Sequence, residues 1–194
     1  MKRHANIFED KTGLDRIIFF SDAVMAIAIT LLLFDLNLPV IALPRIIGYL
    51  LSFAVIGIYW EAHHRTFRSI RRYDRGLIWF NLMYLFFVAL MPFSSRLISF
   101  NPLARPSAIL YAINVALLGV ALLLIFRHAN SGNRLVAEAM TPAELRRRTW
   151  FAMITPILFS LSIGFSFVSI IVTFVFWFLA LLVPTFGRRW MKII

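Results

Sequence analysis

Long apolar stretches alternate with short polar segments along the whole chain of 194 residues. A helix needs about 20 largely apolar residues to cross the hydrocarbon core of a bilayer. Six stretches reach or approach this length, and they are residues 17–38, 46–64, 77–98, 108–126, 150–163 and 165–186. The pattern therefore predicts an all-α, polytopic membrane protein, built as one unit of six transmembrane helices with no soluble domain.

The region 150–186 admits a second interpretation. Its turn signal, Ser162-Ile163-Gly164, is weak, so one long bent helix would give five crossings instead of six. Because the region is too long for a single crossing, we expect two helices. Just before it, Thr141-Pro142-Ala143-Glu144 has the pattern of a helix start. This predicts a short cytoplasmic helix that runs into Arg146-Arg147-Arg148.

Composition agrees with a membrane protein. Hydrophobic residues make up 61% of the chain and the mean hydropathy is +0.83, above the usual values for soluble domains. There are no cysteines, which excludes disulfides and thiolate metal sites. The segment Met1–Asp15 mixes charges of both signs and lacks the short apolar core of a cleaved signal peptide. We therefore expect the first apolar stretch to be retained as a span.

The basic residues predict the topology. Seventeen of the twenty Lys and Arg lie in the N-terminal segment, in residues 65–75 and 127–148, and in the C-terminal tail. Because cytoplasmic loops collect Lys and Arg, we expect an even number of spans in the plasma membrane, with both termini cytoplasmic. The net charge of +11 then indicates orientation and contact with anionic lipids at the cytoplasmic face, and no nucleic-acid partner is expected.

Polar side chains lie at a similar depth in the first three spans, near the inner leaflet. Asp22 follows the basic Arg16 by about 9 Å along a helix axis, and a carboxylate in membrane is costly unless it has a partner. At the matching depth, we expect an interhelical network of Ser21, Asp22, His63, His64 and Asn81. The residues alone leave open whether this network holds the fold or takes part in gating or permeation.

A motif opens the first span. It reads Arg16-x-x-x-Phe20-Ser21-Asp22 and is followed by the apolar run Ala23–Leu33. This pattern resembles the first-helix signature of the transmembrane protein 175 potassium channels, whose bacterial members carry one six-span unit. The resemblance implies a passive, potassium-selective leak channel that assembles as a homotetramer, conducts potassium ions and needs no cofactor. It also implies that the motif makes contacts among the first three helices.

Another face of the first span is apolar. Ile27, Thr30, Leu31 and Phe34 recur at the i, i+3, i+4 and i+7 spacing of one helix stripe. By itself such a stripe is typical of a lipid-facing or packed surface. The resemblance implies instead that the stripe lines the pore, with Ile27 as a hydrophobic constriction and Thr30 in a layer linked to potassium preference. Phe34 departs from the family pattern, in which smaller aliphatic residues are more usual.

Enzymatic chemistry has little support in the sequence. There is no glycine-rich phosphate loop and no nucleophile elbow, and the adjacent His63 and His64 point about 100° apart on a helix, which suits no shared metal. We therefore expect no enzyme and no metal site other than for permeant potassium. An alternative function is a proton-conducting channel or a proton-coupled secondary transporter, with Asp22 and the two histidines as a proton relay.

Overall fold

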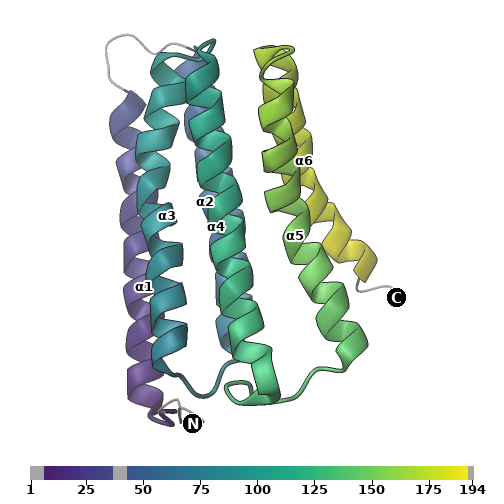
Figure 1. Ribbon diagram of the computed structural model, residues 1–194. Coiled ribbons are helices and arrows are strands. Elements are labelled where there is room, and N and C mark those ends of the chain that lie inside the picture. The colour runs from purple at the N-terminus through teal and green to yellow at the C-terminus, as the bar shows by residue number, and fades with distance from the viewer. Residues whose placement is uncertain (1–6, 37–42, 192–194) are drawn as a thin grey trace, which may run out of the picture.

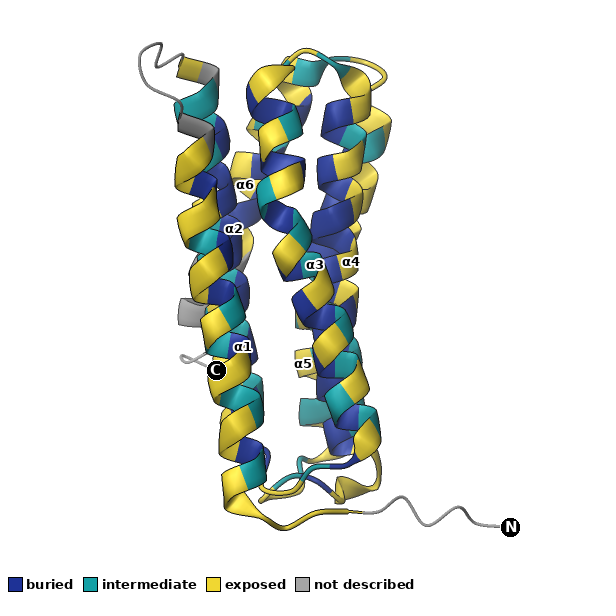
Figure 2. Cartoon of the chain, turned by 90° about the vertical axis from the view of Figure 1, so that its left-hand side faces the viewer, coloured by how far each residue is buried: buried dark blue, intermediate teal, exposed yellow. Residues whose placement is uncertain are grey.

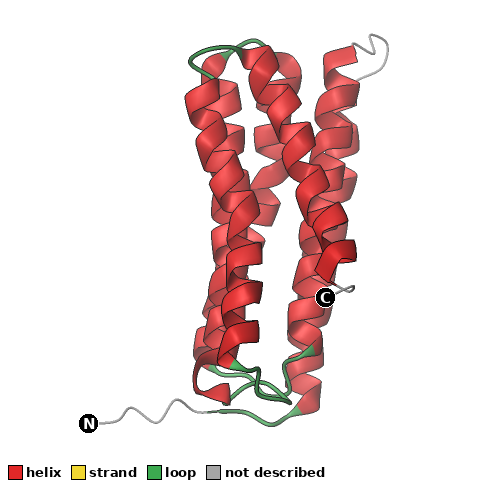
Figure 3. Ribbon diagram, turned by 90° about the vertical axis from the view of Figure 1, so that its right-hand side faces the viewer, coloured by secondary structure: helices red, strands yellow, loops and turns green. Residues whose placement is uncertain are grey.

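Six long helices form one up-and-down bundle in the computed structural model, which describes residues 7–36 and 43–191. The helices are α1 (Lys11–Leu31), α2 (Leu43–Arg68), α3 (Arg75–Phe100), α4 (Arg105–Asn130), α5 (Pro142–Phe165) and α6 (Ile170–Met191), with short 3-10 turns η1 (Leu32–Leu36) and η2 (Ser131–Asn133). Figures 1 and 3 show the connecting loops at the two ends of the bundle. The predicted all-α membrane fold is confirmed.

The helices differ in the length of their apolar parts, and the last helix differs most. Five helices, α1 to α5, are long and apolar enough to cross a membrane. In α6 the described apolar part, Ile170–Val183, is shorter. Region 150–186 does form two helices rather than one bent element. Six crossings, with α6 as the last, therefore remain a prediction.

The start of α5 corrects one prediction and supports another. Thr141 caps the helix by accepting a hydrogen bond from the Glu144 amide, with Pro142 in the first turn, as its sequence predicts. The predicted helix does run into Arg146-Arg147-Arg148, but it is not short, because α5 continues from this cap to Phe165 without a break. The turn into α6 lies after Gly164, because α5 ends at Phe165. Ser162 is therefore still within the helix, where its hydroxyl donates to the Phe159 carbonyl at 2.6 Å.

The core of the bundle lies around α4. In the most apolar stretch of α4, 61% of the residues are buried inside the bundle, whereas the corresponding share is 22% in α1 and in α5. The helix α4 is therefore central, and α1 and α5 are peripheral. The buried side-chain oxygens and nitrogens of the described residues are paired, as an apolar environment requires, except on Ser99, Asn114 and Asn130. The Tyr84 hydroxyl donates to the Tyr59 carbonyl at 3.0 Å, and the buried Trp177 indole of α6 donates to Ser162 of α5 at 2.8 Å. These contacts hold successive helices together.

The basic residues gather at one end of the bundle. There the start of α1 meets the α2–α3 and α4–α5 connections (Figure 1). Phe8 stacks on Tyr73 with ring centroids 5.2 Å apart, and the Arg71 amide donates to the Leu135 carbonyl at 2.8 Å. That this end lies in the cytoplasm stays a prediction, made from the positive-inside rule.

A buried carboxylate joins α3 to α4 at the same end. Asp74 caps α3 by accepting from the Leu77 amide, and its carboxylate lies 2.8 Å from His128 of α4. Burial acts to raise the pKa of Asp74, but the Leu77 hydrogen bond and the nearby His128 and Arg134 outweigh it, so this pKa lies below its usual value. The folded structure therefore stabilises the charged form of Asp74 through contacts that the unfolded chain lacks.

Candidate functional site

The first helix has two different faces. One face is packed against the chain, and its members are Ser21, Met25, Ala28 and, just beyond the helix, Leu32. The other face holds the predicted pore stripe, in which Ile27 is 58%, Leu31 44% and Phe34 76% exposed, and Thr30 is also exposed. Figure 2 shows these alternating buried and exposed positions along α1. The stripe therefore points away from the rest of its own chain.

A buried hydrogen-bonded chain fixes the packed face. Asn81 of α3 donates from its amide nitrogen to the Ser21 hydroxyl at 2.9 Å, and its amide oxygen lies 2.9 Å from His63 Nε2 of α2. The Ser21 hydroxyl in turn donates to the Ile17 carbonyl at 2.8 Å. Since the Asn81 oxygen can only accept, His63 Nε2 must be the donor in this pair. One satisfied chain thus links α1, α2 and α3.

The ring of His63 is also held from both sides. It stacks on Phe67 with centroids 4.3 Å apart and on Tyr84 with centroids 5.0 Å apart. Only 1% of His63 is exposed, so its ring has no room to turn toward solvent. The histidine is consequently a rigid part of the junction between the three helices.

Asp22 lies outside this chain. Its carboxylate accepts a hydrogen bond from the Trp60 indole of α2 at 2.9 Å, and Trp60 stacks on His64 with centroids 5.6 Å apart. Among the described residues no hydrogen bond joins Asp22 to either histidine or to Asn81. The structure therefore divides the expected network into a buried chain and a second, more exposed contact between α1 and α2.

Trp60 is the residue that the sequence reasoning missed. A signal for it exists, because an indole N–H in an apolar segment usually has an acceptor nearby, and Trp60 lies one turn from His64 on α2. Depth along a helix was enough to suggest Ser21, His63 and Asn81 as partners. It was not enough to tell that Asp22, one position after Ser21, turns about 100° away to meet another part of α2.

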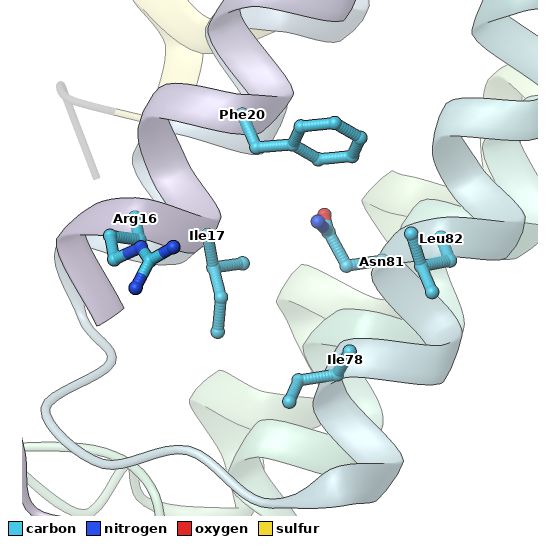
Figure 4. Close-up of a pocket in the computed structure, with 6 residues that line it drawn as sticks. All are labelled: Arg16, Ile17, Phe20, Ile78, Asn81 and Leu82. Carbon is cyan, nitrogen blue, oxygen red and sulfur yellow. The ribbon is translucent and has the colours of Figure 1, made fainter. Parts of the chain in front are cut away.

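Arg16 and Phe20 of the motif border a hollow between α1 and α3. The hollow has a volume of about 320 Å³ and is open to the outside. Figure 4 shows Ile17 and Phe20 projecting from α1 toward Asn81 and Ile78 of α3. In the described part of the chain Arg16 makes no ion pair, so it does not join either of the two contacts above.

The hydroxyl of Thr30 has one fixed bond. It donates to the carbonyl of Ile27 in the same helix at 2.8 Å. With its proton used within α1, the oxygen keeps its lone pairs for an acceptor role on the exposed side. At this position the chain thus presents an oxygen next to an apolar side chain.

Comparisons with known proteins agree with the first-helix motif. A family model described as "Endosomal/lysosomal potassium channel TMEM175" matches residues 16–92, which run from Arg16 to Pro92 within α3. A potassium channel from Chamaesiphon minutus is 30% identical over 179 residues, covering 84% of this chain and 87% of that protein. A potassium channel from Chryseobacterium sp. is 33% identical over 110 residues, covering 53% of this chain and 57% of that relative.

A solved structure extends the likeness to the fold. It is the crystal structure of a lysosomal potassium-selective channel TMEM175 homologue from Chamaesiphon minutus, and it matches with a TM-score of 0.79 and 25% sequence identity. The match covers 91% of this chain and 98% of that one. Both the sequence and the arrangement of helices therefore lead to one conclusion: the chain belongs to the TMEM175 family of ion channels.

Proposed function

We propose that the protein is a passive potassium channel that assembles as a homotetramer around α1. The observation that carries this proposal is the division of α1 into one anchored face and one exposed stripe. Closed cyclic symmetry is the usual form of such assemblies, and it would bring four copies of the stripe face to face around an axis. The bacterial relatives named as potassium channels support the choice of ion.

The conduction path would then have two different layers. Ile27 is apolar and would form a narrow neck that blocks ions by dewetting when it is closed. Thr30, one turn further along, would offer its hydroxyl oxygen to a cation that has lost part of its water. Leu31 and Phe34 would continue the path toward the outer side. We place the protein in the plasma membrane, with the basic end and both termini in the cytoplasm.

A proton relay has less support. It would need Asp22 and His63 or His64 to exchange a proton directly or through a group that both accepts and donates. Instead, Asp22 meets the Trp60 indole, which is a donor only and cannot pass a proton on. His63 donates to Asn81, whose amide does not titrate. The contacts of these residues suit a structural junction better than a relay.

The experiment is a measurement of reversal potentials for the purified protein in planar bilayers, under separate potassium and proton gradients. We expect the potential to follow the potassium gradient without fixed coupling to protons. Ile27→Ala should raise the leak current and relax selectivity, because a shorter side chain widens and wets the neck.

The matched control is Leu33→Ala. Leu33 is 53% exposed in the 3-10 turn η1 that follows α1, close to the 58% of Ile27, but it does not belong to the predicted pore stripe. Its shortening should leave the current unchanged. Potentials that follow the proton gradient would contradict potassium conduction, and equal currents for wild type and Ile27→Ala would remove Ile27 from the neck.

A further inference from the structure

A crevice between α2 and α5 lies outside the proposed conduction path. It has a volume of about 380 Å³ and is floored by α4. Both α2 and α5 pack on α4, but within the described residues they do not pack on each other. The crevice therefore opens between them on the side of the bundle, where the surrounding membrane would reach it.

Tight packing at the deep end of the crevice accounts for its shape. Gly119 of α4 has no side chain, and a Cβ there would lie 2.5 Å from the ring of Pro156 and from the Tyr59 hydroxyl. Pro156 lies inside α5, where a proline removes one helical hydrogen bond and bends the helix. The part of α5 that precedes this proline, from Arg147 to Thr155, forms one wall of the crevice.

Positive charge is concentrated at the mouth. Arg65 of α2 and Arg147 and Arg148 of α5 all line the crevice at the basic end of the bundle. The like charges of Arg65 and Arg148 act on each other across it. Arg147 has no carboxylate partner among the described residues. Such an arrangement is unfavourable when empty and becomes favourable when an anion lies between the guanidinium groups.

Two carboxylates lie near these arginines without closing the site. Arg65 pairs with Glu61 at 3.1 Å and Arg148 with Glu144 at 2.7 Å, each one turn away on its own helix. Pairs of this exposed i,i+4 kind are weak, and a guanidinium has five N–H donors, so further donors remain. The neighbouring Thr66 and Ser69 hydroxyls donate to backbone carbonyls. The arginines must therefore supply the donors to any bound anion.

The interior of the crevice is apolar. From the arginines it extends inward past Phe126, Phe151 and Leu122 to Ile58. Arg65 and Ile58 are seven residues apart on α2, which gives the crevice a depth of about 10 Å along the helix axis. A free inorganic anion would use only the mouth. An anion attached to an apolar chain would use both the mouth and the interior.

We propose that this crevice binds an anionic phospholipid of the cytoplasmic leaflet, with the phosphate held by Arg65, Arg147 and Arg148 and part of an acyl chain lying along the apolar interior. Charge complementarity and the adjacent apolar lining select this occupant. The residues that line the crevice lie on α2, α4 and α5, so the test of this proposal is separate from the test of the pore stripe on α1.

The test measures lipid retention by native mass spectrometry of the detergent-purified protein, after titration with phosphatidylglycerol or phosphatidylcholine. We expect phosphatidylglycerol to bind at least about tenfold more tightly, because its phosphate and the arginines form charge-assisted hydrogen bonds without a competing choline cation. Arg147→Gln/Arg148→Gln should reduce phosphatidylglycerol binding to the phosphatidylcholine level. The control Arg127→Gln/Arg146→Gln removes two exposed arginines from the same end that do not line the crevice, and it should bind like wild type.

A second pair of variants leaves the charge unchanged. Ala152→Phe fills the crevice and should abolish retention, whereas Ala143→Phe, on the same helix but away from it, should not. Inorganic phosphate added alone should not displace the lipid. Each of three results would overturn the proposal. They are equal binding of phosphatidylglycerol and phosphatidylcholine, equal loss of binding in the two arginine double variants, and displacement of the lipid by inorganic phosphate.

Discussion

Replacing Asn81 by Leu tests the buried junction of the first three helices. Asn81 makes two hydrogen bonds, to Ser21 and to His63, and all three residues are at most 2% exposed. Leucine has a similar size but neither donor nor acceptor. The substitution therefore removes both bonds and leaves the His63 N–H without an acceptor in a dry place.

The magnitude follows from these contacts. A net hydrogen bond contributes about 1 kcal/mol and an unpaired buried donor costs about 1–3 kcal/mol, whereas interhelical hydrogen bonds in membranes average only about 0.6 kcal/mol. We expect a loss of about 2 kcal/mol for Asn81→Leu. For a chain of this size that corresponds to a fall in melting temperature of roughly 4–8 °C.

The assay is thermal unfolding of the purified protein in detergent, arranged as a double-mutant cycle with His63→Phe. Phenylalanine keeps the stacking on Phe67 and Tyr84 but has no N–H to leave unpaired. The double variant should therefore be more stable than the sum of the single losses by about 1 kcal/mol. Asn114→Leu is the control, because Asn114 bonds to Ser94 and Met91 and has no contact with His63. An unchanged melting temperature for Asn81→Leu, or strict additivity with His63→Phe, would refute the assigned chain.

Three further predictions concern separate contacts. Trp60→Phe removes the indole N–H that donates to the Asp22 carboxylate and should cost about 1 kcal/mol in thermal unfolding, non-additively with Asp22→Asn; full additivity would contradict the pairing. Thr30→Val should lower the potassium-over-sodium permeability ratio in bi-ionic recordings while Thr30→Ser keeps it, and equal ratios in all three proteins would exclude a role in selection. The pKa of Asp74 is lower in the folded than in the unfolded chain, so Asp74 stabilises the fold fully above its unfolded pKa of about 4, and this stabilisation is lost as the pH falls through its folded pKa. Asp74→Asn should therefore make the melting temperature fall less steeply as the pH is lowered. An unchanged fall would count against the Asp74 contacts.

Helix number and polar depth were predictable, but rotation about the helix axis was not. The rise per residue is constant, so the distance of Ser21, His63 and Asn81 from the basic end could be counted along the chain. The partner of Asp22 depends on which way α1 faces, and that is decided by the packing of Met25 and Ala28 against the bundle. The length of an apolar stretch does not indicate this rotation, so it could not identify Trp60 as the partner of Asp22.

Helix ends were less predictable than helix cores for a related reason. Apolar length marks the part of a helix that lies in hydrocarbon, whereas the helix itself ends where its backbone hydrogen bonds end. At α5 the sequence predicts the cap at Thr141, but apolar length does not show that the helix continues unbroken through Arg146-Arg147-Arg148 into the apolar stretch. Those extra turns bring Arg147 and Arg148 to the mouth of the crevice that α5 forms with α2.

The two faces of α1 cannot be independent. Ser21 and Ile27 are six residues apart, about 9 Å along one rigid helix, so the position of the proposed neck is set by the contact that Asn81 makes with Ser21. A shift of α1 at this contact changes the direction of the helix and therefore moves Ile27. Dewetting of a narrow apolar neck depends steeply on its width, so a small shift at the buried chain would have a large effect on current. The junction of the first three helices thus connects the stability of the fold to the width of the proposed pore, although no residue of that junction faces the ion.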